Sequence, residues 1–160
     1  MDAQPQVMVY DATHFNLFKT VKHVLPFQDE CRALLCGEDL IWVMDLNNGK
    51  CLMSRQLDSQ LLCWCNDGST DFLCVLQDAI YKICAEDFKT SSRVCYVSAA
   101  VRAMTTLKSG AILVVSFKGH TRAYNVDTGA TMMEFSKMSY TIKPFPDDIH
   151  FVGVGNHHDL

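Results

Sequence analysis

The sequence lacks an excess of positive charge. Its 160 residues carry 14 Lys and Arg against 18 Asp and Glu, for a formal net charge of -4, and the charges are scattered rather than clustered in tails. Proteins that bind nucleic acid through phosphates need a basic stripe or patch, and none is present. The composition therefore argues against a nucleic-acid-binding function.

The sequence also lacks a long apolar run. The longest, Ala111 to Phe117, is interrupted by Ser116 and is far shorter than the roughly 20 residues that cross a bilayer as a helix. The first residues, MDAQPQV, do not have the pattern of a signal peptide. We expect no membrane insertion and a cytoplasmic location.

Cysteine is abundant, but the spacing typical of metal sites is missing. None of the eight cysteines forms a C-x-x-C pair, and the closest pair is Cys63 and Cys65 on either side of Trp64. Cys36, Cys74 and Cys84 lie within apolar runs, where a free thiol behaves as a small hydrophobic group. We expect reduced, buried cysteines, no metal and no disulfide framework.

Catalytic motifs are missing as well. The sequence has no G-x-S-x-G elbow and no phosphate-binding loop, and Gly153-Val154-Gly155 has no third glycine after it. The C-terminal His157-His158-Asp159 is interpreted as a polar terminus rather than a metal site, because neighbouring residues in a strand point to opposite faces. We expect no catalytic residues, no cofactor and no enzyme activity.

A repeating strand is what the sequence does contain. The segment TRAYNV at 121–126 resembles IYKICA at 80–85, IWVMDL at 41–46 and VMVYDA at 7–12, at intervals of roughly 40 residues. Polar turns follow three of the copies, in LNNGK, AEDFK and VDTGA. Short apolar strands precede them, in RALLC, DFLCVL and AILVVSF.

The repeat unit is therefore four antiparallel strands in about 40 residues, which is the pattern of a β-propeller blade. We predict an all-β fold in one propeller-like domain spanning 1–160. Its predicted parts are a half blade at 7–22, complete blades at 23–58, 59–98 and 99–137, and a half blade at 138–157.

These residues resemble the WD-repeat family. Tyr124-Asn125 stands where the Trp-Asp pair of that family would be, and Tyr10-Asp11 and Met44-Asp45 keep the Asp. His23 lies at a suitable place before a first strand, and Asp39 and Asp78 fall in the turn before a third strand, where the family often has Asp. The strand and Asp-x-x-Thr-Gly pattern is also similar to quinoprotein-like propellers, so an enzyme or a metal- or cofactor-binding propeller is the alternative.

The two half blades leave two arrangements open. They join into one blade and close a four-bladed ring, or the chain forms an arc of a larger propeller, which we favour. In an arc, bare sheet edges at both ends favour self-association.

We expect the chain to be a non-catalytic scaffold that binds other proteins. The resemblance implies a part of a larger signalling or trafficking regulator. Loops on a rigid scaffold carry binding more often than core positions do, so the candidate binding residues lie in the turns before each third strand and in one loop between blades: His23, Glu38, Asp39, Gln77, Asp78, Lys118 and His120. Asn47, Asn48, Asn66, Asp67, Lys108 and Ser109 are expected on the opposite face.

Overall fold

The structure is a computed structural model that describes residues 7–9, 19–57, 59, 61–137 and 141–155. Strands make up all of the regular secondary structure in this part of the chain, and none of its segments is a helix long and apolar enough to cross a membrane. The all-β fold class predicted from the repeat is therefore confirmed. Tyr10-Asp11 and His157-His158-Asp159 lie outside the described residues.

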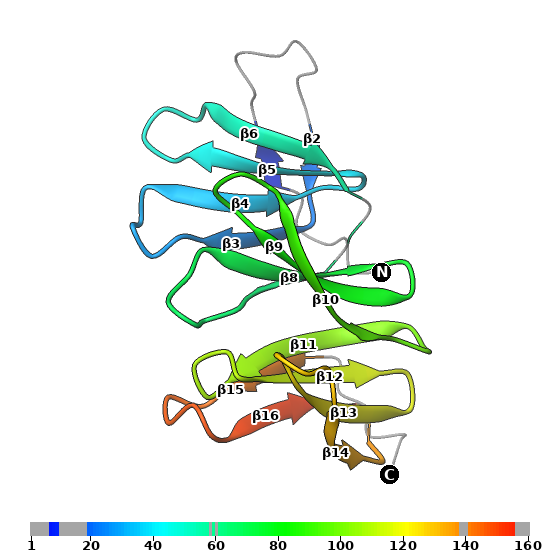
Figure 1. Cartoon of the computed structure of the whole chain (residues 1–160). Coiled ribbons are helices and arrows are strands. Elements are labelled where there is room, and N and C mark those ends of the chain that lie inside the picture. The colour runs from blue at the N-terminus through cyan, green and yellow to red at the C-terminus, as the bar shows by residue number, and fades with distance from the viewer. Residues whose placement is uncertain (1–6, 10–18, 58, 60, 138–140, 156–160) are drawn as a thin grey trace.

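Sixteen described strands form five antiparallel sheets in which each strand pairs with the next along the chain. Three sheets have four strands, and the sheets at the two ends have two each (Figure 1). The end sheets contain β1 (Val7–Val9) with β2 (Lys19–Val21), and β15 (Thr141–Pro144) with β16 (Phe151–Val154). The first four-stranded sheet contains β3 (His23–Pro26), β4 (Arg32–Cys36), β5 (Leu40–Asp45) and β6 (Cys51–Gln56). The second contains β7 (Leu62–Trp64), β8 (Asp71–Leu76), β9 (Ala79–Cys84) and β10 (Thr90–Tyr96). The third contains β11 (Val101–Leu107), β12 (Ile112–Phe117), β13 (His120–Asn125) and β14 (Thr131–Phe135).

The row of sheets is open. Among the described residues, β1 pairs only with β2 and β16 pairs only with β15, so the two end sheets do not combine into one. The backbones of neighbouring sheets come closest at their first strands, where β3 contacts β7, β7 contacts β11 and β11 contacts β15. The structure thus has the order of blades predicted from the sequence but not a closed four-bladed ring.

The second strand of each complete sheet is buried on both of its faces. In β8, Phe72 and Cys74 face the preceding sheet, whereas Leu73 faces the following one, and all three side chains are inaccessible to solvent. Successive side chains of a strand point to opposite faces. A strand buried on both faces therefore needs a continuous apolar run, and FLCVL is such a run.

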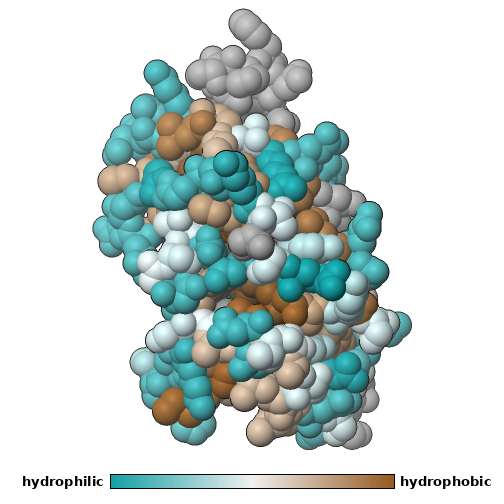
Figure 2. Space-filling model, in the orientation of Figure 1, coloured by the Kyte–Doolittle hydropathy of each residue, from teal (hydrophilic) through white to brown (hydrophobic). Residues whose placement is uncertain are grey.

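The hydrophobic core is divided into layers between consecutive sheets. One cluster lies between the first and second four-stranded sheets, with Leu34 and Phe72 at its centre. The next lies between the second and third and includes Leu73 and Phe117. Smaller clusters join the end sheets to their neighbours through Val21 and Ile142. In the view of Figure 2, hydrophobic residues come to the surface mainly in the seam between the second and third four-stranded sheets.

Polar contacts fasten the sheets to one another. The indole Nε1 of Trp64 in β7 donates to the carbonyl of Pro26 in β3, at 2.9 Å. The guanidinium of Arg32 binds both carboxylate oxygens of Glu86, at 2.8 and 3.0 Å, across the same two sheets. Arg55 adds a bond of 2.7 Å to the carbonyl of Phe88. These bonds restrict sliding of one sheet over the next, which the apolar layers alone do not.

Two glycines allow the backbones of neighbouring sheets to approach closely. Gly129, in the turn between β13 and β14, has a φ of +72°. A Cβ atom there would lie 2.3 Å from the carbonyl oxygen of Val94 in β10. Gly110, in the turn between β11 and β12, makes the same type of close approach. A Cβ atom added there would lie 2.1 Å from the carbonyl oxygen of Cys65. Glycine is required at both positions by the conformation and by the contact.

All eight cysteines are thiols, and none of them forms a disulfide. Cys36, Cys65, Cys74 and Cys95 are buried, and Cys31 is exposed. Burial raises the pKa of Cys65 and Cys74 to about 12 and that of Cys95 to about 11. These side chains are therefore inaccessible, and their thiols are protonated at neutral pH. Because the thiolate is the reactive form, we expect them to react slowly.

We predict that Cys31 reacts at least about tenfold faster than Cys65 or Cys74 with iodoacetamide in the native protein at pH 8. Mass spectrometry of peptides after a short pulse of reagent would measure the three rates separately. In about 8 M urea the labelling rates of the three cysteines should converge, because unfolding exposes Cys65 and Cys74. Equal labelling of Cys74 and Cys31 in the native protein would contradict the buried position of Cys74.

Candidate functional site

The turns between second and third strands gather at one end of the three complete sheets, which we call the turn face. Because the three sheets have the same strand order and direction, equivalent turns emerge at the same end. The turn face carries five exposed side chains: Glu38, Asp39, Gln77, Asp78 and Lys118. The structure therefore brings five of the candidate binding residues to one end of the molecule.

Backbone hydrogen bonds fix these turns to the loops that connect consecutive sheets. The amide of Leu57 donates to the carbonyl of Asp39 at 2.9 Å, and the amide of Val97 donates to the carbonyl of Asp78 at 2.7 Å. In the third sheet, Lys118 donates its amide to the carbonyl of Ala100 at 3.2 Å. Each turn is thus tied to a neighbouring loop while its side chains stay exposed, and Glu38 also pairs with Lys22 at 3.7 Å.

The two candidate histidines also lie at this end, but they are half-buried. His120 begins β13, and its ring stacks on Phe117 with centroids 4.9 Å apart and planes at 24°. His23 begins β3. The Nδ1 atom of His23 and the Nε2 atom of His120 are buried and have no hydrogen-bond partner among the described residues. Each ring therefore has one polar atom that a ligand or a water molecule could satisfy.

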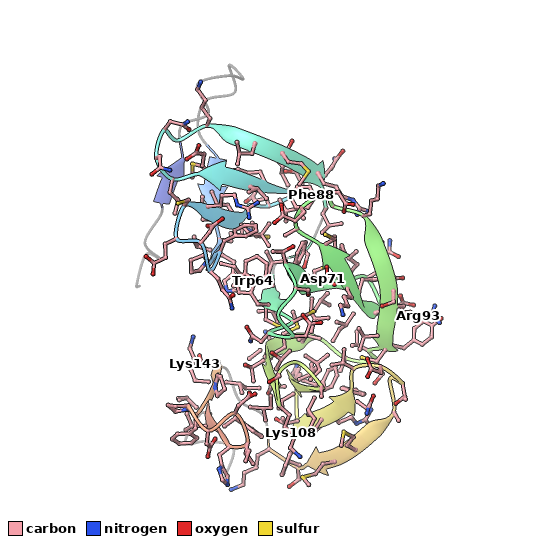
Figure 3. All side chains as sticks on the ribbon, turned by 60° about the vertical axis from the view of Figure 1, so that its left-hand side comes forward. Trp64, Asp71, Phe88, Arg93, Lys108 and Lys143 are labelled. Carbon is pink, nitrogen blue, oxygen red and sulfur yellow. The ribbon has the colours of Figure 1, made fainter. Side chains whose placement is uncertain are left out.

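A central cavity of about 300 Å³ lies beside His23. It is lined by residues of all four first strands, β3, β7, β11 and β15. Arg102 of β11 and Lys143 of β15 belong to this lining together with His23. Figure 3 shows the sheets following a curve, with Lys143 pointing into its open side.

Arg102 and Lys143 are not among the binding residues predicted from the sequence. Both stand in first strands, in VRAM and TIKP, where the neighbouring residues are apolar or uncharged. The sequence did contain a signal, namely a positively charged residue within an otherwise uncharged first strand. In an innermost strand such a residue faces either a neighbouring sheet or the central space. Recognising it required knowing that first strands line the centre, and the repeat alone did not show which strand is innermost.

The pKa of His23 is lowered, first by burial and then by the positive charge of Lys143. Both effects disfavour the protonated imidazolium. The side chain is therefore held in its neutral form at neutral pH, with one nitrogen donating and the other accepting hydrogen bonds.

This lowered pKa predicts a loss of stability in mild acid. Below the ordinary pKa of 6.5, the unfolded chain binds a proton at His23 more readily than the folded chain does. Stability is therefore present above that value and falls as the pH drops towards the lowered pKa of the folded state. Urea titration would measure the free energy of unfolding at pH 7.5 and 5.5. The drop between these two values should be smaller in His23→Gln than in the wild type. An equal pH dependence in both proteins would contradict it.

The opposite end of the sheets carries the other set of turns. Asn47 and Asn48 lie in the turn between β5 and β6, and Lys108 and Ser109 lie between β11 and β12. Much of this end is occupied by internal bonds. Asn66 donates to the hydroxyl of Thr106 at 3.0 Å. Some polar side chains of this end, Asn66 among them, are therefore occupied by internal bonds.

Charged pairs at this opposite end connect strands and turns. Arg32 lies between Asp29 and Glu86, and these bonds lower the pKa of both carboxyl groups. Lys82 binds Asp67 at 3.1 Å. Each of these carboxylates already has a cationic partner, so none of them is an isolated acid available for proton transfer.

A second hollow lies at the outer edge of the third sheet. It has a volume of about 500 Å³ and lies between the end of β14 and the start of β16. The rings of Phe135 and Phe151 meet edge to face there, with centroids 6.1 Å apart. All five side chains of β14 are exposed, whereas alternate positions of β6 are half-buried. The difference arises because a complete sheet follows β6 and only two strands follow β14.

No three His, Cys, Asp or Glu side chains in the described part of the chain come together in an arrangement that could hold a metal ion. The exposed groups of the turn face can take part in charge pairing and hydrogen bonding. Its acidic turns and Lys118 offer both signs of charge to a partner.

A scan against protein-family models gives no match. A search of curated proteins finds no relative either.

Proposed function

We propose that this chain is a non-catalytic protein–protein interaction scaffold of the WD-repeat-like type, and that it binds its partner through the turn face. One observation carries the proposal: three equivalent turns project exposed polar side chains from the same end of a rigid set of sheets. Binding residues occur mainly on loops that a rigid scaffold positions.

The blade-like sheets support the WD-repeat-like assignment, together with the Tyr124-Asn125 and Met44-Asp45 pairs at the ends of the third strands β13 and β5. Within this proposal the chain is an arc of a larger propeller in a cytoplasmic signalling or trafficking regulator. Its eight cysteines, all thiols rather than disulfides, support a reducing compartment.

The proposal is tested by reversing charge on one face at a time. The turn-face variant is Glu38→Lys with Asp78→Lys, and the control is Glu30→Lys with Asp127→Lys. All four positions are exposed, and the control residues lie in turns at the opposite end. Both variants therefore change the net charge by the same amount.

Partners captured by the immobilised wild-type chain would be identified, and the strongest would be purified for titration against all three proteins. We expect the turn-face variant to raise the Kd at least about tenfold, because like charges placed opposite one another weaken association and slow it. The control should bind as the wild type does. Equal weakening by both variants, or weakening by the control alone, would refute the assignment of the turn face.

A further inference from the structure

The central cavity is positively charged in a protein whose net charge is negative. Its charged or titratable basic lining groups come from three of the four first strands: His23 from β3, Arg102 from β11 and Lys143 from β15. The fourth strand, β7, contributes the thiol of Cys63, whose pKa is raised by burial so that it stays neutral. No Asp or Glu is among the described residues that line the cavity.

No described residue neutralises the two permanent cations there. Neither Arg102 nor Lys143 forms an ion pair or a side-chain hydrogen bond with any described residue, and both side chains are exposed. Arg32, Lys82 and Arg122 each have a carboxylate partner. Like charges gathered in a concave space reinforce one another and attract an anion.

His23 adds a directional group to this charge. Its Nδ1 atom is buried and has no partner among the described residues, although its ring lines the cavity. A buried ring nitrogen is ordinarily satisfied by hydrogen bonding. An anionic oxygen in the cavity could accept a hydrogen bond from Nδ1–H of this ring. It would also be attracted by the positive charge of Lys143, which acts on the same ring.

The position of the cavity connects it with the turn face. Its lining includes Thr141, the first residue of β15, and His23, the first residue of β3, and both lie at the end of the sheets that carries the turn face. A volume of about 300 Å³ is at the lower end of the range for small-molecule sites. It has room for one side chain or a small anion but not for a helix.

We propose that the central cavity binds an anionic oxygen group, a phosphate or a carboxylate, presented by a side chain of the partner that docks on the turn face. Arg102 and Lys143 supply the charge, and the ring of His23 supplies a hydrogen bond. This inference rests on the proposed function and adds the chemistry of the ligand to it. Arginine binds such groups through two parallel N–H bonds, and lysine acts as a point charge.

The test uses small anions on the full chain, so it does not depend on finding a partner. Sulfate serves as the tetrahedral probe, because its charge does not change between pH 5.5 and 7.5, about the range of interest for a histidine. Malonate serves as the carboxylate probe. Binding is measured by calorimetry and by the ring resonances of His23 in NMR spectra, at constant ionic strength.

The cavity variant is Arg102→Gln with Lys143→Gln. The control is Lys50→Gln with Lys89→Gln, two exposed lysines in turns at the opposite end, which removes the same charge. We expect the wild type and the control to bind at least one probe equally, and the cavity variant to bind it at least about tenfold more weakly. Sulfate binding alone would assign the ligand as a phosphate-like group, and malonate binding alone would assign it as a carboxylate.

A pH series separates the role of His23 from that of the two cations. Sulfate binding by the wild type should strengthen as the pH falls from 7.5 to 5.5, because protonation of His23 adds a charge, and His23→Gln should show a flatter profile. Identical profiles would overturn the role of His23. Absence of binding of both probes to the wild type, or equal binding by the cavity variant, would overturn the site and leave the turn-face experiment unaffected.

Discussion

Replacing Gly129 with alanine is expected to lower the free energy of unfolding by about 2–4 kcal/mol. Part of the loss is conformational, because φ is +72° at this residue and a side chain in the left-handed region costs roughly 1 kcal/mol. The larger part is steric. The new Cβ would lie 2.3 Å from the carbonyl oxygen of Val94, so the turn and β10 would have to separate, and overpacking of this kind costs about 1–3 kcal/mol.

Gly49 provides a matched control. It occupies the equivalent place in the turn between β5 and β6, with a φ of +69°, but nothing lies within 4 Å of its added Cβ. Gly49→Ala should therefore show only the conformational cost of roughly 1 kcal/mol. Urea titration of both variants would measure the difference. Equal losses would show that the two sheets do not approach one another closely at Gly129.

Truncating Phe72 to alanine is expected to cost about 3–5 kcal/mol, as is usual for a fully buried phenylalanine. Phe72 has no exposed surface and lies in the layer between the first and second four-stranded sheets. Its ring meets that of Phe88 edge to face, with centroids 6.4 Å apart and planes at 86°. The cavity left behind would lie between two sheets, which are fastened by Arg32 and Arg55 and so cannot close over it freely.

The control for this truncation is Phe145→Ala, because that ring is 49% exposed. Its loss should change the free energy of unfolding by less than about 1 kcal/mol. Both variants can be followed by the urea dependence of tryptophan fluorescence, since Trp64 packs against the same layer as Phe72. A loss for Phe72→Ala no larger than that for Phe145→Ala would contradict the layered core.

The strands could be predicted because their signals are local. Each signal is contained within a few consecutive residues. The structure has strands at the apolar runs RALLC and FLCVL, and turns after Asp45 and Asn125. The repetition of this local pattern was enough to predict four-stranded sheets. The bonds between sheets could not be predicted, because the ion pair of Arg32 with Glu86 joins residues 54 positions apart.

The turn residues of the candidate site could be predicted from the sequence, but the cations of the central cavity could not. Glu38 and Asp78 lie in turns, and turns can be located from strand periodicity alone. Arg102 and Lys143 belong to different sheets and come near His23 only through the curvature of the row, which depends on how each sheet packs on the next. No local pattern encodes that curvature.

The layered core has a consequence for how the molecule opens. Each hydrophobic cluster joins only two consecutive sheets, so the sheets are coupled in series, like the units of a linear array. The end sheet β15–β16 has a neighbour on one side and Ile142 as its only buried apolar side chain among the described residues. Amide protons should therefore exchange with solvent fastest in this sheet and slowest in β8, which is buried on both faces. The protein would open progressively from its ends, with the middle sheet the last to lose protection.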